Sequence, residues 1–251
     1  MSTLDEFADA KLARLETRHL KRSLRETWRT ANTRAERDGR ALVSFCCNDY
    51  LGLSQHANVK RAAIQAIEHF GVGAGASRLV TGNHPLYRDL EIRLARFKGQ
   101  EKASVFGSGY LTNSGVIPSL VGPKDLIILD ELSHASTHAG TQLSGARIEK
   151  FAHNDPDHCR QILSETRADY PRCLVLTEGV FSMDGDRGPL GPLAELATEY
   201  DAWLLVDDAH GFGVLGGGRG ASFEDDPAPA IPLHMGTLSK AIGAYGGFIC
   251  A

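Results

Sequence analysis

The sequence lacks the signatures of several protein classes. Its five cysteines are an odd number, and none form a C-x-x-C pair, which argues against a disulfide framework and a zinc ribbon. No apolar run approaches membrane-spanning length, so we expect no membrane segment. The net charge of -4 gives no positive footprint for nucleic acid. The acidic start (Asp5, Glu6, Asp9) has no apolar core and resembles neither a secretory signal nor a transit peptide. The odd number of cysteines favours reduced thiols and therefore a cytoplasmic protein.

The composition that remains is that of an ordinary soluble globular protein, with 42% hydrophobic and 23% charged residues. Residues 4 to about 37 are charged and helix-favouring, with one thin apolar stripe at Leu20, Leu24 and Trp28. This pattern predicts a long helix that lies across a domain or against a partner subunit. A short strand is expected at 42–45. We therefore divide the chain into an N-terminal segment, 1–47, and a large domain, 48–251.

The large domain has a repeating pattern. Two amphipathic helices are expected first, at 59–70 and at 86–97, the second ending at Gly99. Short apolar runs then alternate with amphipathic helices, and the runs are at 103–106, 126–129, 146–151, 173–176 and 203–206. A further strand is expected at 232–235. Such alternation predicts an α/β fold, a mainly parallel sheet with helices on both faces.

Ligands of parallel sheets bind beyond the carboxyl ends of the strands, so the residues that follow each run are expected to share one surface. Ser108 and Gly109 begin a helix whose free N–H groups suit a phosphate, although for these residues alone an N-cap with a tight turn is the favoured explanation. The glycines at 71–75 resemble a dinucleotide loop only loosely, because a helix and not a strand precedes them.

Lys240 follows the last expected strand and is surrounded by glycines and small residues. Burial lowers the pKa of a lysine and frees its nitrogen for covalent chemistry with an aldehyde. The alternative is a lysine that extends from a loop into water.

Acidic and imidazole groups follow other strands. Asp207 ends a fully apolar run, where a carboxylate needs a cationic partner, an N-cap role or a structural ion pair. His210 is close enough in sequence to reach the same ligand. His134 and His138 have the i, i+4 spacing of a zinc helix without a matching glutamate, and a flat ring stacked on an aromatic ligand suits His134 better than a metal does. We expect no metal. Taken together, a lysine, an acid and a helix N-terminus match pyridoxal phosphate.

At this point the sequence resembles a known family, the α-oxoamine synthases, which are pyridoxal-phosphate enzymes of the aspartate-aminotransferase-like fold (fold type I). The resemblance covers nearly the whole chain from Arg22 onward. The segments that carry it are 48–53, 73–79, 108–110, 132–136, 151–155, 178–186, 207–211 and 237–240.

The resemblance implies a role for each matching residue. Lys240 would bind the cofactor aldehyde covalently and later move the proton of the amino acid α-carbon. Asp207 would pair with the ring nitrogen, His210 would hydrogen-bond the phenolic oxygen, and His134 would stack on the ring. The resemblance also implies that the phosphate is held by Ser108, Gly109, Tyr110 and Thr237. Ser182 would lie near the phenolic oxygen, and Asn48 and Glu178 near the reacting centre. Arg22, or Lys21 in its place, would bind the acyl carboxylate.

The resemblance also implies the reaction, a decarboxylative condensation of an L-amino acid with an acyl thioester in a homodimer. The form of residues 207–211 favours L-alanine with a pimeloyl thioester, in biotin synthesis. A relative that condenses glycine or serine remains an alternative, as does a non-catalytic member of the family. Family members continue through a C-terminal small domain beyond Ala251, and we expect the 251-residue chain alone to be poorly soluble or inactive.

Overall fold

The computed structural model describes residues 2–29 and 33–251 and divides into two units, residues 1–47 and 48–251. The first unit begins with helix α1 (Thr3–Thr17), where Ser2 and Asp5 cap each other: the Asp5 N–H donates to Ser2 Oγ and the Ser2 N–H donates to Asp5 Oδ2. No residue of α1 is buried. Three short strands follow and form an antiparallel sheet in the order β1 (Trp28–Arg29), β2 (Arg34–Arg37), β3 (Arg40–Val43).

The prediction of one long helix from residue 4 to about 37 is therefore wrong. Leu20, Leu24 and Trp28 lie beyond the end of α1 and stay exposed, so the thin stripe has no packing surface to sustain a helix. Asp38 and Gly39 both have positive φ, the geometry of a tight hairpin turn, and they join β2 to β3. The expected strand at 42–45 ends two residues earlier, at Val43. Residues 30–32, which the long helix also included, lie outside the described residues.

The second unit is built on a seven-stranded sheet. Its order is β4-β10-β9-β8-β7-β5-β6, and β10 runs antiparallel to both neighbours while the other pairs are parallel. The strands are β4 (Ala103–Phe106), β5 (Leu126–Asp130), β6 (Arg147–Phe151), β7 (Cys173–Glu178), β8 (Trp203–Asp207), β9 (Leu233–Thr237) and β10 (Gly247–Cys250). The predicted mainly parallel sheet is confirmed, and β10 is an addition to it.

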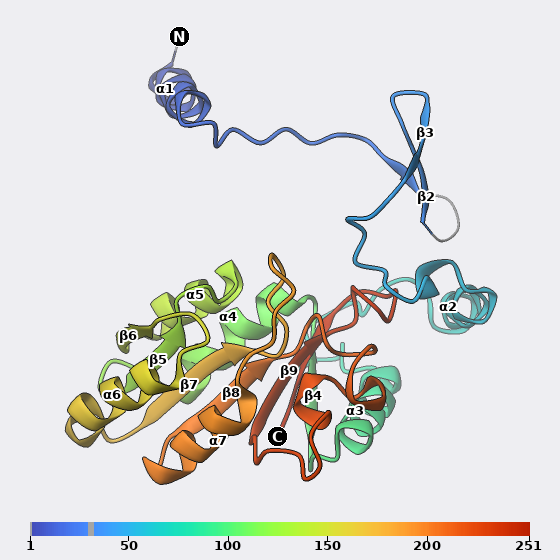
Figure 1. Cartoon of the computed structure of the whole chain (residues 1–251). Helices are drawn as coiled ribbons and strands as arrows, with labels where there is room; N and C mark the ends of the chain where they lie inside the picture. The colour runs from blue at the N-terminus through green and yellow to red at the C-terminus, as the bar shows by residue number, and fades with distance from the viewer. Residues whose placement is uncertain (1, 30–32) are drawn as a thin grey trace. The chain divides into compact units, whose positions relative to one another are not determined.

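Helices cover both faces of this sheet (Figure 1). They are α3 (Pro85–Lys98), α4 (Gly109–Leu120), α5 (Ala135–Ser144), α6 (Pro156–Thr166) and α7 (Leu190–Glu199), whereas α2 (Ala57–Phe70) precedes them and has no buried residue. Side chains alternate between the two faces along each strand. On β5, Leu126 and Ile128 pack with α6 and α7, whereas Ile127 and Leu129 pack with α4. Both faces of β5 are therefore apolar, and its one acidic residue, Asp130, stands at its carboxyl end.

No helix of the described residues is both long enough and apolar enough to span a bilayer. The parallel strands β5, β7, β8 and β9 end at the same edge of the sheet, and β4, which is antiparallel to the antiparallel β10, ends there too. This edge is where ligands of such sheets bind.

Candidate active site

A cavity of about 180 Å³ lies at this edge of the sheet. Nine of the residues singled out in the sequence line it: Ser108, Gly109, Tyr110, His134, Glu178, Asp207, His210, Thr237 and Lys240. The other lining residues are Ser136, Ala209, Met235 and Ser239. The fold thus brings together side chains from five strand ends.

Lys240 lies in a tight turn directly after β9. The turn is closed by two backbone hydrogen bonds, from the Leu238 N–H to the Gly246 carbonyl and from the Gly243 N–H to the Lys240 carbonyl, both 2.9 Å. Burial lowers the pKa of the Lys240 amine, and the opposing charges of Asp207 and Glu178 only partly restore it. A lowered pKa increases the fraction of neutral amine, which is the form that attacks an aldehyde.

Asp207 ends β8 and is buried. Its Oδ1 accepts from the Ala209 N–H at 3.1 Å, and its Oδ2 accepts from Asn113 Nδ2 at 2.8 Å. Two donors therefore fix the carboxylate before any ligand arrives. Asn113 comes from α4 and was not singled out in the sequence; its one signal was a polar residue on an otherwise apolar helix face.

His210 is held by a tyrosine that the sequence reading did not assign a role. Tyr50 Oη lies 2.6 Å from His210 Nδ1 and 3.3 Å from Asn48 Oδ1. Burial, with the nearby charges of Lys240 and His134, lowers the pKa of His210 to about 4, so the ring is neutral at pH 7. Tyr50 Oη has one proton, so it donates either to Asn48 Oδ1 or to His210 Nδ1. In the second case the neutral His210 ring carries its proton on Nε2 and can donate it to a ligand.

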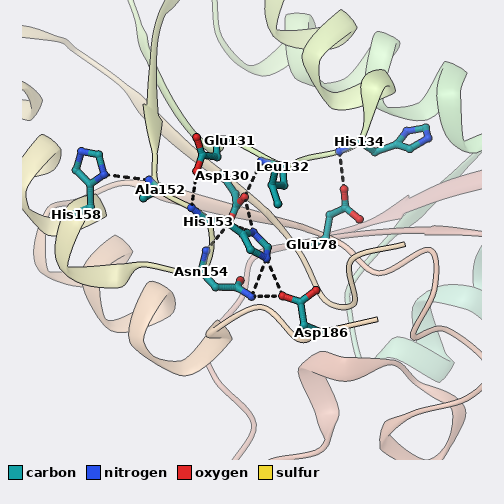
Figure 2. A network of polar contacts seen from close by, with 10 residues as sticks. All are labelled: Asp130, Glu131, Leu132, His134, Ala152, His153, Asn154, His158, Glu178 and Asp186. Atoms are coloured by element: carbon teal, nitrogen blue, oxygen red, sulfur yellow. Dashed lines mark hydrogen bonds and ion pairs between the residues drawn. The ribbon is translucent and has the colours of Figure 1, made fainter. Parts of the chain in front are cut away.

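His134 is the N-cap of α5, and its ring is held by its own helix. Nδ1 accepts from the Ser136 N–H at 3.1 Å, and the His134 N–H donates to Glu178 Oε1 at 2.5 Å (Figure 2). Burial and the charge of Asp207 raise the pKa of Glu178 to about 8, against the opposing His134 hydrogen bond and Lys240 charge. Glu178 therefore anchors the backbone beneath the ring of His134. No His, Cys, Asp and Glu cluster suited to a metal occurs in residues 2–29 and 33–251.

The start of α4 has the geometry that the predicted phosphate site requires. Ser108 Oγ accepts from the Leu111 N–H at 3.1 Å, which leaves the first-turn N–H groups of Gly109 and Tyr110 without intrahelical acceptors. A Cβ on Gly109 would lie 3.1 Å from Met235 Cε, so glycine lets the chain approach β9 closely. Thr237 Oγ1 donates to the Gly246 carbonyl at 2.8 Å, and its hydroxyl must rotate to donate to a phosphate.

Three predicted residues do not line this cavity. Ser182 is exposed and lines a neighbouring cavity of about 290 Å³, which it shares with Tyr50 and His210. Asn48 contacts Tyr50, and Tyr50 in turn contacts His210. Arg22 belongs to the first unit, where it is exposed. The roles given to all three stay predictions.

A second polar network supports the loops beside the cavity (Figure 2). The ring of His153 lies between two carboxylates, with Nδ1 3.0 Å from Asp130 Oδ1 and Nε2 2.7 Å from Asp186 Oδ2. Asp130 also accepts from the Leu132 N–H, and the side chain of Asn154 donates to Asp186. Burial lowers the pKa of His153, but hydrogen bonds to the two carboxylates outweigh it and the pKa is raised. The network ties together the loops after β5, β6 and β7.

The donor set suits one kind of group. One cavity contains the Lys240 amine with its lowered pKa, the fixed Asp207 carboxylate, the His134 ring and the N-terminus of α4. These groups match the aldehyde, ring nitrogen, ring face and phosphate of pyridoxal phosphate. The close approach allowed by Gly109 keeps the predicted phosphate site open, and the residues present therefore fit this cofactor.

Comparison with known proteins agrees with this geometry. The family described as aminotransferase class I and II matches residues 40–251. The chain belongs to this family. Family relatives include the 8-amino-7-oxononanoate synthase of Beijerinckia indica, which is 60% identical over 251 residues, covering 100% of this chain and 65% of the relative. That of Granulibacter bethesdensis is 54% identical with the same coverage. The chain thus spans about two thirds of the length of these relatives.

Solved structures of the aminotransferase class I and II type are also similar. A serine palmitoyltransferase of S. paucimobilis, with bound PLP and myriocin, has a TM-score of 0.90 and 32% identity, covering 100% of this chain and 64% of that one. An 8-amino-7-oxononanoate synthase of Francisella tularensis has a TM-score of 0.66 and 30% identity, covering 82% and 57%. The predicted fold type I and the resemblance to α-oxoamine synthases are confirmed.

Proposed function

We propose that this chain forms the pyridoxal-phosphate site of an enzyme that condenses L-alanine with a pimeloyl thioester, of coenzyme A or acyl carrier protein. Carbon dioxide is lost and 8-amino-7-oxononanoate is formed, for biotin synthesis. The observation that supports this most is the meeting of Lys240, Asp207 and His134 in one cavity. The 60% identity to the Beijerinckia indica synthase over the whole chain supports the choice of substrates.

Bound pyridoxal phosphate would supply a conjugated ring that takes up the electrons left at the amino acid α-carbon when its proton departs. The chain's own residues bind, orient and move the proton. Lys240, whose pKa is lowered by burial, would hold the cofactor at its aldehyde carbon and, as a free amine, would accept the proton of the α-carbon. Asp207, fixed by two donors, accepts a hydrogen bond from the ring nitrogen. The N–H groups at the start of α4 bind the phosphate.

The imidazoles and the outer residues complete the assignment. His210 is neutral at pH 7 and would hydrogen-bond the phenolic oxygen of the cofactor, while Tyr50 fixes its ring. His134 covers one ring face at the start of α5. The remaining predicted residues keep their proposed roles. Ser182 would contact the phenolic oxygen, and Asn48 and Glu178 would lie near the reacting centre. The phosphate would be bound by Ser108, Gly109, Tyr110 and Thr237, and the acyl carboxylate by Arg22.

We also propose that the protein acts as a homodimer in the cytoplasm. Val72 and Leu79, in the segment between α2 and α3, are 91% and 99% exposed, and exposed apolar segments of this kind mark protein interfaces. The five cysteines are free thiols, which suits a reducing compartment.

A second candidate is a relative that condenses glycine or L-serine with another acyl thioester. The TM-score of 0.90 to a serine palmitoyltransferase supports it. Visible absorbance of the cofactor-loaded protein, titrated with L-alanine, glycine and L-serine, separates the two. Our proposal expects L-alanine to bind about tenfold more tightly than the others and to release carbon dioxide with pimeloyl-CoA. Tighter binding of glycine or L-serine would favour the second candidate.

A further inference from the structure

Asn113 lies where three elements of the candidate site meet. It is fully buried on α4, the helix whose N-terminus faces the cavity. Its Nδ2 lies 2.8 Å from Asp207 Oδ2 at the end of β8, 3.0 Å from Ser136 Oγ and 3.3 Å from Thr137 Oγ1 at the start of α5. A single side-chain amide thus contacts both the carboxylate and the helix that carries His134.

The packing of α5 on α4 makes this contact possible. A Cβ on Gly140 would lie 2.5 Å from the backbone oxygen of Asn113, so only glycine at that position lets the two helices approach so closely. The approach brings the hydroxyls of Ser136 and Thr137 within reach of the amide. The contact is therefore built by the backbone as well as by side chains.

The orientation of the amide also follows from its surroundings. Nδ2 faces the carboxylate, while Oδ1 is buried and, among the described residues, has no hydrogen-bond partner. Turning the amide around would direct Oδ1 at a carboxylate oxygen, and the two acceptors would repel each other. An unpaired buried carbonyl is costly, so the position is better explained by what the N–H group does than by what the amide as a whole contributes to stability.

We propose that Asn113 is a positioning residue, whose amide N–H holds the Asp207 carboxylate in the orientation that meets the cofactor ring nitrogen and links it to the start of α5. This inference rests on the proposed function. The amide touches neither the ring nor the reacting atoms; it acts through Asp207. An apolar residue of similar size keeps the packing and removes the hydrogen bond to Asp207, whereas a carboxyl group can donate that hydrogen bond only while it is protonated.

Two variants and a control separate this role from packing. Asn113→Leu removes the donor. Asn113→Asp keeps it as an O–H at low pH, because two carboxyl groups at this distance cannot both be charged and one keeps its proton until the pH is well above its usual pKa. Thr141→Val is the control: Thr141 is buried on α5, donates to the His138 carbonyl at 2.8 Å and does not line the cavity.

The charged and titratable groups around the pair are shared by all variants. They are Asp208 directly after β8, Glu178 on β7, Lys240 after β9, His134 at the start of α5 and His210. Each variant is therefore compared with the wild type at the same pH. The dissociation constant of pyridoxal phosphate is measured by the absorbance of the bound cofactor, from about pH 5.5 to about pH 9, and the thermal midpoint is measured without cofactor.

We expect Asn113→Leu to weaken cofactor binding about 10- to 100-fold at every pH, the loss of one hydrogen bond to a charged group. Asn113→Asp is expected to bind within about threefold of the wild type at the acidic end and to approach the Leu variant at the alkaline end. Thr141→Val should bind the cofactor as the wild type does. A Leu variant within about twofold of the wild type, or an Asp variant whose ratio to the wild type does not change with pH, overturns the proposal.

The thermal midpoint distinguishes a failure of this inference from a failure of the proposed function. If the wild type binds no pyridoxal phosphate, the proposed function fails, but the hold on Asp207 is still tested. The midpoint of Asn113→Asp should then fall relative to the wild type as the pH rises, while the deficit of Asn113→Leu stays constant. If the thermal midpoints of Asn113→Asp and the wild type change in parallel with pH, the inference is overturned even where the cofactor binds.

Discussion

Lys98 and Asp208 form an ion pair that is completely buried behind the candidate site. The variant Lys98→Met should show how much this ion pair contributes to the free energy of unfolding. Lys98 Nζ lies 3.4 Å from Asp208 Oδ2 and donates to the Arg219 carbonyl at 2.7 Å, and both side chains are 0% exposed. Asp208 Oδ1 accepts only from the Ala221 N–H, at 3.1 Å, among its described contacts. Methionine fills the volume of the lysine and leaves the carboxylate without its cation.

The expected loss is large, because removing one partner of a buried ion pair strands the other. Such losses are about 3–5 kcal/mol, against the roughly 5–15 kcal/mol that stabilises a typical domain. Burial already raises the pKa of Asp208 to about 6, although Lys98 and the Ala221 N–H oppose the shift. Without Lys98 that pKa rises further. A carboxyl with a raised pKa in the folded state loses stability as the pH rises, so the deficit of Lys98→Met should be smaller at about pH 5 than at about pH 8.

Urea unfolding at the two pH values measures this deficit. The double variant Lys98→Met, Asp208→Asn removes the stranded charge and should recover about 1–3 kcal/mol of the loss at pH 8. A single variant that costs less than about 1 kcal/mol, or a double variant no more stable than the single one, would refute the reasoning.

Two further predictions concern the loops and the predicted phosphate site. His153→Asn should destabilise the fold by about 1–3 kcal/mol at about pH 6 and by less at about pH 9. The reason is that a histidine with a raised pKa contributes stability that is lost as the pH rises through that pKa. Urea unfolding measures the loss, and an equal loss at both pH values would contradict the prediction. Gly247→Ala should lower the free energy of unfolding by about 1–3 kcal/mol, since its Cβ would lie 2.7 Å from the Gly109 backbone nitrogen. The control, Gly191→Ala on α7, meets nothing within 4 Å and should be neutral or stabilising. Equal shifts of the melting temperature in the two variants would rule out the close approach.

The sheet and most of its site could be predicted from the sequence because both depend on local patterns. Apolar runs mark strands, and a parallel sheet places the residues that follow them at one edge. Asp207 and Lys240 were found in this way, although they are separated by β9. β10 was not found, since its glycine-rich start gives little strand signal and its antiparallel direction breaks the repeat.

Contacts between distant segments were beyond sequence reasoning. Asn113 and Asp207 are 94 residues apart, and Tyr50 and His210 are 160 apart, so neither pair leaves a local pattern. The long N-terminal helix is absent for another reason: its apolar stripe is too thin to be buried, and periodicity alone does not stabilise a helix. Asp38 and Gly39 favour a hairpin turn, which interrupts any helix there.

The central claim is that Lys240 binds pyridoxal phosphate covalently. Borohydride reduction of the protein after incubation with the cofactor, followed by peptide mass analysis, tests it most directly. One reduced adduct is expected, on the peptide that contains Lys240, and Lys240→Ala should lose this labelling. An adduct confined to other lysines, or a Lys240→Ala variant that is labelled as strongly as the wild type, would contradict it.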